Sequence, residues 1–152
     1  MKERAISKSD IKDINKKFYD KYEIELFGKK DNIRFVEGEF NYYKKDGFVL
    51  LVDIEGILIP TLKLLLENNF LPKVTCDMGA VKFLCKGADL MKPGILNVEE
   101  FGKGSIVSVV DENNGKPIAI CRALYSSEEI QDMKEGKVLE NLHFVGDDLW
   151  NL

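Results

Sequence analysis

The sequence predicts an α+β protein with two small domains, the second of which is a mixed β-barrel with two short helices. A chain of 152 residues is long enough for one medium or two small domains. Helical periodicity is limited to a few short segments, whereas runs of β-branched and aromatic residues recur along most of the chain. With 45% hydrophobic and 32% charged residues, the composition is that of a globular protein and not of a disordered one.

The first domain, residues 1–71, is predicted to begin with an amphipathic helix over residues 9–22. Ser7 and Ser9 are alternative N-caps, because a hydroxyl can accept a hydrogen bond from a backbone N–H of the first turn. Hydrophobic residues then recur at helical spacing: Ile11, Ile14, Phe18 and Tyr22.

Extended segments follow this helix, and a second helix ends the domain. The strands that we expect are Ile33–Phe40, Tyr42–Lys45, Phe48–Ile54 and a short strand over residues 57–59. Asp46-Gly47 is a hairpin signal. Pro60 suits the first turn of the second helix, because its missing N–H has no partner to lose there. The apolar face of that helix consists of Leu62, Leu65 and Leu66.

The second domain, residues 72–152, is organised around a short helix. Asp77 is its expected N-cap, and Gly87 is its expected C-terminal stop, because glycine adopts a left-handed conformation without a Cβ penalty. Lys82 and Lys86 are four residues apart and share the polar face. The spacing predicts an apolar face of Val81, Leu84 and Cys85, with Phe83 at its margin.

The remaining elements of the second domain are mostly strands. A strand over residues 88–91 leads into a turn at Lys92-Pro93-Gly94, with Gly94 at a positive φ. Later strands are expected at Ile106–Val110, Pro117–Leu124 and Val138–Val145, with a helix from Ser126 or Ser127 to Met133. The alternation in these strands fits a sheet that is buried on both faces or closed into a barrel. Leu149-Trp150 is expected to close the core.

Charge is distributed unevenly. The net charge is −4, which at first argues against binding to nucleic acid. Residues 1–71 are balanced, and residues 93–152 carry five basic and eleven acidic side chains. Residues 73–92 carry four lysines against Asp77 and Asp89, a net charge of +2. A basic patch on an acidic body is typical of a protein that docks at one site and does not coat nucleic acid generally.

No enzyme or metal signature is present. His143 and the cysteines Cys76, Cys85 and Cys121 lack zinc-ligand spacing, and three cysteines cannot all pair. A Cys–His nucleophile pair stays open, because such partners meet only in the fold. The Gly102–Ser105 segment fails the P-loop pattern. We therefore expect a cytoplasmic protein with reduced thiols and with no catalytic residues, cofactor or metal.

Neither a signal peptide nor a membrane span is predicted. The N-terminal residues lead directly into a capped polar helix. The longest apolar runs are far shorter than the ~20 residues that a membrane helix needs.

Three stretches resemble a known family. They are DMGAVKFLCKGADLMKPGI (77–95), GKPIAICRAL (115–124) and SSEEIQDMKEGKVLENLHFVGDDLW (126–150). The first resembles the opening of a PUA domain, an RNA-binding pseudobarrel of RNA-modifying enzymes and translation factors. The last, together with the Pro60–Leu65 helix, resembles the malignant T-cell-amplified-sequence family in particular. The resemblance implies a pre-PUA domain over residues 1–71 and a PUA domain over residues 72–152.

In function, the resemblance implies a non-catalytic translation factor that binds tRNA or rRNA on the small ribosomal subunit. Members of the family act with a partner that carries a SUI-type domain. No such domain follows here, so the partner is expected in trans. The short N-terminal half is that expected of an archaeal or minimal member.

The resemblance also implies the RNA-binding residues. PUA domains use the first helix, the following strand and the next turn. The matching positions are Gly79, Lys82, Lys86, Gly87, Ala88, Asp89, Met91 and Pro93, with Lys92 adjacent. Arg122 is a weaker candidate, which either faces RNA or pairs with an acidic side chain. If three or four phosphates are neutralised, affinity should fall about 20- to 100-fold between 50 and 200 mM salt.

Two other functions remain open. The chain could be an RNA-targeting module or subunit of a tRNA- or rRNA-modifying enzyme, in which case a catalytic chain should accompany it. It could also be a scaffold that binds proteins through its acidic C-terminal half.

Overall fold

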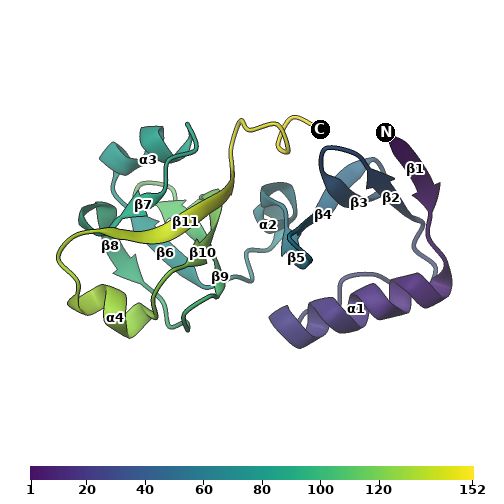
Figure 1. Ribbon diagram of the computed structural model, residues 1–152, viewed down its shortest axis with the longest axis horizontal. Helices are drawn as coiled ribbons and strands as arrows, with labels where there is room; N and C mark the ends of the chain where they lie inside the picture. The colour runs from purple at the N-terminus through teal and green to yellow at the C-terminus, as the bar shows by residue number, and fades with distance from the viewer. The chain divides into compact units, whose positions relative to one another are not determined.

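A computed structural model describes residues 1–152 as two compact units, Met1–Leu64 and Leu65–Leu152. The predicted α+β class is confirmed. The first unit is an antiparallel sheet with one long helix, and the second is a mixed, nearly closed sheet with short helices (Figure 1). None of the helices combines the length and the apolar character that a bilayer crossing requires.

The first unit contains a five-stranded antiparallel sheet in the order β1-β2-β3-β4-β5. The strands are β1 (Lys2–Ala5), β2 (Ile33–Glu37), β3 (Asn41–Lys45), β4 (Phe48–Ile54) and β5 (Ile57–Pro60). The helix α1 (Lys8–Tyr22) begins after Ser7, whose hydroxyl accepts a hydrogen bond from the Asp10 N–H at 3.0 Å. Ser7 is therefore the N-cap, and Ser9 is not. The buried face of α1 is Ile11, Ile14 and Phe18.

Three details of the first unit differ from the expectation. The polar strand β1 carries no hydrophobic pattern; it pairs with β2, and its Glu3 carboxylate bonds Arg34 and Lys44. The expected strand Ile33–Phe40 ends at Glu37, before a bend at Gly38. Pro60 closes β5 and does not open a helix, and α2 (Leu62–Glu67) starts after it.

The second unit contains a six-stranded sheet in the order β7-β11-β10-β9-β6-β8. Its strands are β6 (Lys73–Cys76), β7 (Leu90–Met91), β8 (Ile95–Val98), β9 (Ile106–Asp111), β10 (Pro117–Ala123) and β11 (Lys137–Phe144). The only parallel pair is β6 with β9. The edge strands β7 and β8 are joined by a single 3₁₀ turn, η1 (Lys92–Gly94), so the sheet curls toward a barrel. The strand β8 was not predicted from the sequence.

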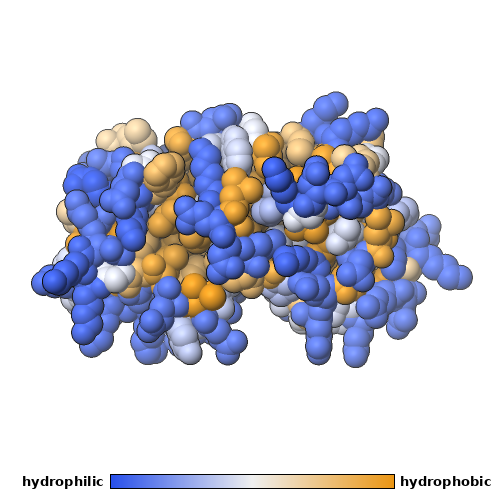
Figure 2. All heavy atoms as spheres, turned by 180° about the vertical axis from the view of Figure 1, so that it is seen from behind, coloured by the Kyte–Doolittle hydropathy of each residue, from blue (hydrophilic) through white to orange (hydrophobic).

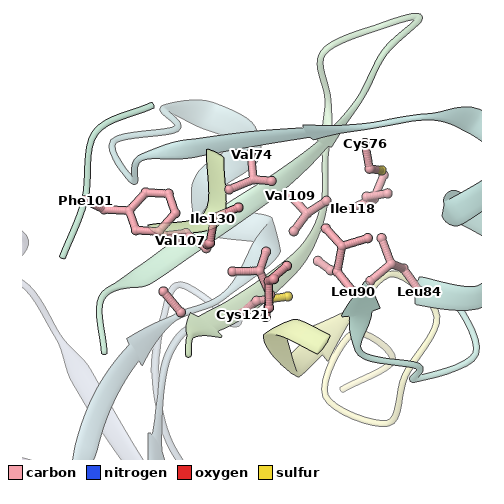
Figure 3. Close-up of a cluster of buried hydrophobic side chains, with 14 residues drawn as sticks. Val74, Cys76, Leu84, Leu90, Phe101, Val107, Val109, Ile118, Cys121 and Ile130 are labelled. Carbon is pink, nitrogen blue, oxygen red and sulfur yellow. The ribbon is translucent and has the colours of Figure 1, made fainter. Parts of the chain in front are cut away.

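Two short helices belong to this unit: α3 (Met78–Leu84) and α4 (Ser127–Asp132). Ser126 and Glu129 form a capping box at the start of α4. Every residue of β9 is buried, which matches the expected sheet with two covered faces. Side chains from strands and from both helices meet in one core, among them Val107, Val109, Leu84, Leu90 and Ile130 (Figure 3). Leu149 is buried, and Trp150 is partly buried.

Candidate nucleic-acid interface

The helix α3 presents Lys82 to solvent because its other side is anchored in the core. The helix ends at Leu84, so Lys86 lies in the turn that follows and not, as predicted, on the polar face of the same helix. The Asp77 carboxylate accepts a hydrogen bond from the Ala80 N–H at 2.8 Å and caps the helix, as the sequence predicts. Leu84 is buried in the core cluster. Lys82 and Lys86 are exposed and form no ion pair. The lysine charge is therefore available to a ligand.

Gly87 turns the chain sharply after α3. Its φ is +94°, and the Ala88 N–H reaches back to the Phe83 carbonyl at 3.0 Å. A Cβ at this position would lie 3.2 Å from Cε1 of Phe144 in β11. Both the backbone conformation and the close approach of Phe144 therefore require glycine. The turn chemistry predicted for Gly87 is confirmed.

Gly79 and Gly94 differ in what they require. A Cβ on Gly94 would lie 3.1 Å from Ala80 Cβ and 3.3 Å from a Leu90 methyl group. Gly94 is not at a positive φ, so that expectation is wrong, and close packing is the reason for glycine. At Gly79 an added Cβ would meet only the Asp77 carboxylate, at 3.3 Å. Glycine in a helix costs about 0.5–1 kcal/mol relative to alanine. An alanine at Gly79 would thus crowd only the capping carboxylate of Asp77, and the backbone of Gly79 is exposed.

An open depression of about 490 Å³ lies beside α3, β7 and η1. Its lining includes five of the ten residues that were predicted as a site: Gly79, Ala88, Asp89, Met91 and Pro93. Phe83 also lines it. The structure therefore brings half of the predicted residues to one concave surface, with Lys82 on the adjoining helix. Charged and polar side chains cover much of the face in Figure 2, and hydrophobic groups show between them.

Asn141 of β11 holds the turn between α3 and β7 in place. Its Nδ2 donates to the carbonyls of Leu84 at 3.1 Å and Ala88 at 3.0 Å. Its backbone N–H donates to the Asp89 carboxylate at 2.7 Å, and Lys137 pairs with the same carboxylate at 3.2 Å. Asp89 is thus occupied within the fold, and its charge is compensated. The Asn141 Oδ1 atom is buried without a hydrogen-bond partner.

Lys92 and Arg122 are held by the fold. The Lys92 ammonium donates to the Ile130 carbonyl at 2.7 Å, at the C-terminal end of α4, where the helix dipole favours a cation. The Arg122 guanidinium donates to Glu140 through Nη2 at 2.6 Å and through Nε at 3.2 Å. Of the two alternatives predicted for Arg122, the structure shows the pairing with an acidic side chain. Neither side chain lines the depression.

Sequence reasoning missed three residues of this surface. Phe83 is 55% exposed, although it was placed at the margin of the apolar face. Phe83 directly precedes the buried Leu84 in the helix and so points in a different direction, which was the signal in the sequence that its ring is exposed. Asn141 and Lys137 reach the site from β11, about fifty residues along the chain, and no local pattern marks them.

Cys76 and Cys121 belong to the core cluster, Cys85 is partly buried, and His143 is buried. Nδ1 of the buried His143 lies 2.8 Å from the Asp147 carboxylate. Burial tends to raise the Asp147 pKa, but hydrogen bonds from His143 and from two backbone N–H groups outweigh it and hold that pKa below its usual range. Burial raises the pKa of the Cys76 thiol to about 11. No group of three metal-ligating side chains occurs.

Comparisons with known proteins agree with this geometry. The PUA domain family model matches residues 72–145. An uncharacterized protein of Methanocaldococcus jannaschii is 42% identical, over 96% of this chain and 93% of that protein. Translation machinery-associated protein 20 of Saccharomyces cerevisiae is 35% identical, over 84% of this chain and 76% of that protein.

A solved structure has the same fold over nearly the whole chain. The crystal structure of a PUA domain protein from Aeropyrum pernix K1 superposes with a TM-score of 0.87 at 27% identity, covering 98% of this chain and 89% of that one. The chain therefore belongs to the family of PUA-domain proteins that includes translation machinery-associated protein 20 and the malignant T-cell-amplified sequence proteins.

Proposed function

We propose that this protein is a non-catalytic, cytoplasmic RNA-binding factor of the translation machinery that docks on tRNA or on rRNA of the small ribosomal subunit. The observation that carries the proposal is that two lysines without an ion pair, Lys82 and Lys86, lie beside a concave, glycine-bordered surface, within a segment of net charge +2 (residues 73–92). Membership of a PUA family with translation-associated relatives supports the same function.

The surface suits a phosphate backbone at its rim. The lysines Lys82 and Lys86 form no ion pair within the protein, so phosphate contacts would not have to displace an internal partner. Small residues at Gly79 and Ala88 let a ribose-phosphate chain come close to the backbone. Because Lys92 already binds the end of α4, two lysines remain as phosphate contacts, fewer than the sequence suggested.

Two phosphate contacts set the scale of the affinity. They correspond to a decline of roughly 7- to 12-fold between 50 and 200 mM salt. Such a patch binds weakly by itself, so a second contact must raise the effective affinity. We propose that this contact is supplied by the ribosome or by a partner with a SUI-type domain acting in trans.

The test is binding to small ribosomal subunits by sedimentation, in parallel with a tRNA titration. Lys82→Glu/Lys86→Glu should weaken binding to at least one target by tenfold or more at 50 mM salt and should remove most of the salt dependence. The matched control is Lys103→Glu/Lys116→Glu, which makes the same charge change at exposed positions of the same unit. It should bind nearly as wild type does.

Each other outcome has a defined meaning. If both double variants fold and bind equally well, the proposed surface is wrong. Binding to tRNA without binding to the subunit, together with co-purification of a catalytic chain, would favour a targeting module for an RNA-modifying enzyme. If neither RNA binds and a protein partner does, the scaffold function is favoured.

A further inference from the structure

The helix α1 of the first unit, the long helix of Figure 1, carries lysines without acidic neighbours along one side. Side chains three and four positions apart in a helix lie next to one another. The four such neighbours of Lys12 are Lys8, Ser9, Asn15 and Lys16, and none of them is acidic. Lys8 and Lys12 are exposed and form no ion pair. Their charge is therefore not compensated within the fold.

The other exposed side of α1 is built differently. The neighbours of Lys17 at the same spacings include Asp13 and Asp20, so its charge is balanced locally. Like charges four residues apart destabilise a helix, so the lysine series of the first side works against helix stability. The stability of α1 therefore does not explain why lysines gather on one side.

The lysine series continues to the turn that follows the helix. Lys16 pairs with Asp20 at 3.4 Å, but both side chains are largely exposed. Tyr19, two helical turns after Lys12, is 51% exposed. Lys16, Tyr19 and Lys29 line one open depression of about 470 Å³. The turn thus brings Lys29 next to the lysines of the helix.

The turn that carries Lys29 is fixed by hydrogen bonds. The Asn15 side chain donates through Nδ2 to the Phe27 carbonyl at 2.8 Å and accepts through Oδ1 from the Phe27 N–H at 3.0 Å. The Asp31 carboxylate accepts a backbone hydrogen bond within the turn at 2.7 Å and pairs with Lys45 at 3.1 Å. Because Asp31 is engaged with Lys45, Lys29 forms no ion pair and is available to a ligand.

The depression itself is unsuited to phosphate. Two carboxylates line it, Asp20 and Glu25, and only Asp20 has a lysine partner. Phosphates would therefore lie along the side of the helix, where no carboxylate is a neighbour of Lys12, and would pass the depression at its rim. The lysines on this path, which we call the lysine row, are Lys8, Lys12, Lys16 and Lys29.

We infer that the lysine row binds the phosphate backbone of ribosomal RNA on the small subunit and provides the second contact that the patch at Lys82 and Lys86 requires. This inference rests on the proposed function and names the surface by which the first unit takes part in it. Successive lysines of the helix are about 6 Å apart along its axis, so they meet a run of phosphates. The Tyr19 hydroxyl adds a neutral donor of a kind that bonds phosphate. The contact depends on charge and not on base sequence.

The test is sedimentation of the full chain with small ribosomal subunits at several salt concentrations. Lys8→Glu/Lys12→Glu should weaken binding about tenfold or more at 50 mM salt, and the decline between 50 and 200 mM should shrink by roughly 7- to 12-fold, the share of two phosphate contacts. The matched control is Lys17→Glu/Lys21→Glu, which makes the same charge change at exposed positions on the other side of the same helix. It should bind nearly as wild type does.

Arginine separates charge from shape. Lys8→Arg/Lys12→Arg keeps both positive charges and should bind the subunit as wild type does. Far-ultraviolet circular dichroism should be unchanged in every variant, so that a loss of binding is a loss of contact and not of the helix. If the arginine variant loses as much binding as the glutamate variant, the row does not act through its charge and the inference is overturned.

The remaining outcomes distinguish this inference from the function on which it rests. If Lys82→Glu/Lys86→Glu weakens binding to tRNA or to the subunit while Lys8→Glu/Lys12→Glu leaves subunit binding intact, the proposed function stands and the lysine row is wrong. If the row variant and its control weaken binding equally, overall charge is responsible, which also overturns the inference. If neither Lys8→Glu/Lys12→Glu nor Lys82→Glu/Lys86→Glu changes binding to either target, the proposed function fails as well.

Discussion

Replacement of Gly87 by alanine tests how tightly the turn after α3 is built. Two separate penalties arise from one added methyl group. The backbone is at φ +94°, where L-residues are disfavoured, and the new Cβ would lie 3.2 Å from Cε1 and 3.4 Å from Cζ of Phe144. The aromatic ring or the turn must therefore shift by a few tenths of an ångström.

The size of the effect follows from these two terms. A left-handed conformation costs a non-glycine residue roughly 1–2 kcal/mol. Overpacking against a ring adds about 1 kcal/mol or more. We expect Gly87→Ala to lower the free energy of unfolding of the second unit by about 2–3 kcal/mol.

Gly146→Ala is an internal control for the backbone term. Gly146 has a φ of +93°, and an added Cβ there would have no atom within 4 Å. It should therefore show the conformational penalty alone, about 1–2 kcal/mol. The difference between the two variants isolates the contact with Phe144.

Urea unfolding followed by tryptophan fluorescence is the appropriate assay. Trp150 is the only tryptophan and belongs to the second unit, so the signal reports on that unit. Combining Gly87→Ala with Phe144→Leu should recover part of the loss. If Gly87→Ala is no more destabilising than Gly146→Ala, the Phe144 ring does not constrain the turn, and the conclusion that its close approach requires glycine at position 87 is refuted.

Two further predictions concern the core of the second unit. Because the folded pKa of Asp147 is held low, its carboxylate stabilises the protein above the unfolded pKa of about 4, and this stability is lost as pH falls through the folded value. The urea concentration at the unfolding midpoint should therefore decrease when the pH is lowered below about 4. Asp147→Ala leaves His143 without its partner and should cost about 2–3 kcal/mol of unfolding free energy at pH 7. Its urea midpoint should then decrease less than that of wild type when the pH is lowered. Alkylation of the native protein at pH 8 should modify the partly buried Cys85 first, and the buried Cys76 and Cys121 only after unfolding. Peptide mass spectrometry measures the modification of each thiol. Equal labelling rates for all three thiols would contradict this prediction.

The parts of the fold that sequence predicts well are those that local chemistry determines. Asp77 and Ser126 cap their helices as expected, because an acceptor three residues before a free N–H needs no distant partner. The left-handed turn at Gly87 follows from the same local logic. The strand β1 escaped prediction because edge pairing and ion pairs stabilise it without any hydrophobic pattern.

Residues whose state depends on distant partners could not be assigned from sequence. Lys92 looked like a free cation beside the turn, yet the carbonyl of Ile130 binds it from α4. Gly94 looked like a turn glycine, yet packing against Ala80 requires it. In each case the sequence identified an important residue but not its reason, because the reason lies in an element that only the fold brings near.

The candidate site combines two kinds of residue that behave differently under sequence analysis. Residues that obey local rules, such as Asp77 and Gly87, form the frame. Residues that break them are the better candidates for contact: Gly79 leaves a helix turn bare, and Phe83 points an aromatic ring at solvent. Neither exception follows from core packing, and local inconsistency of this kind is expected at functional positions. They lie on one helix and border one depression beside Lys82, so a single ligand in that depression would contact both, as the proposed RNA-binding function requires.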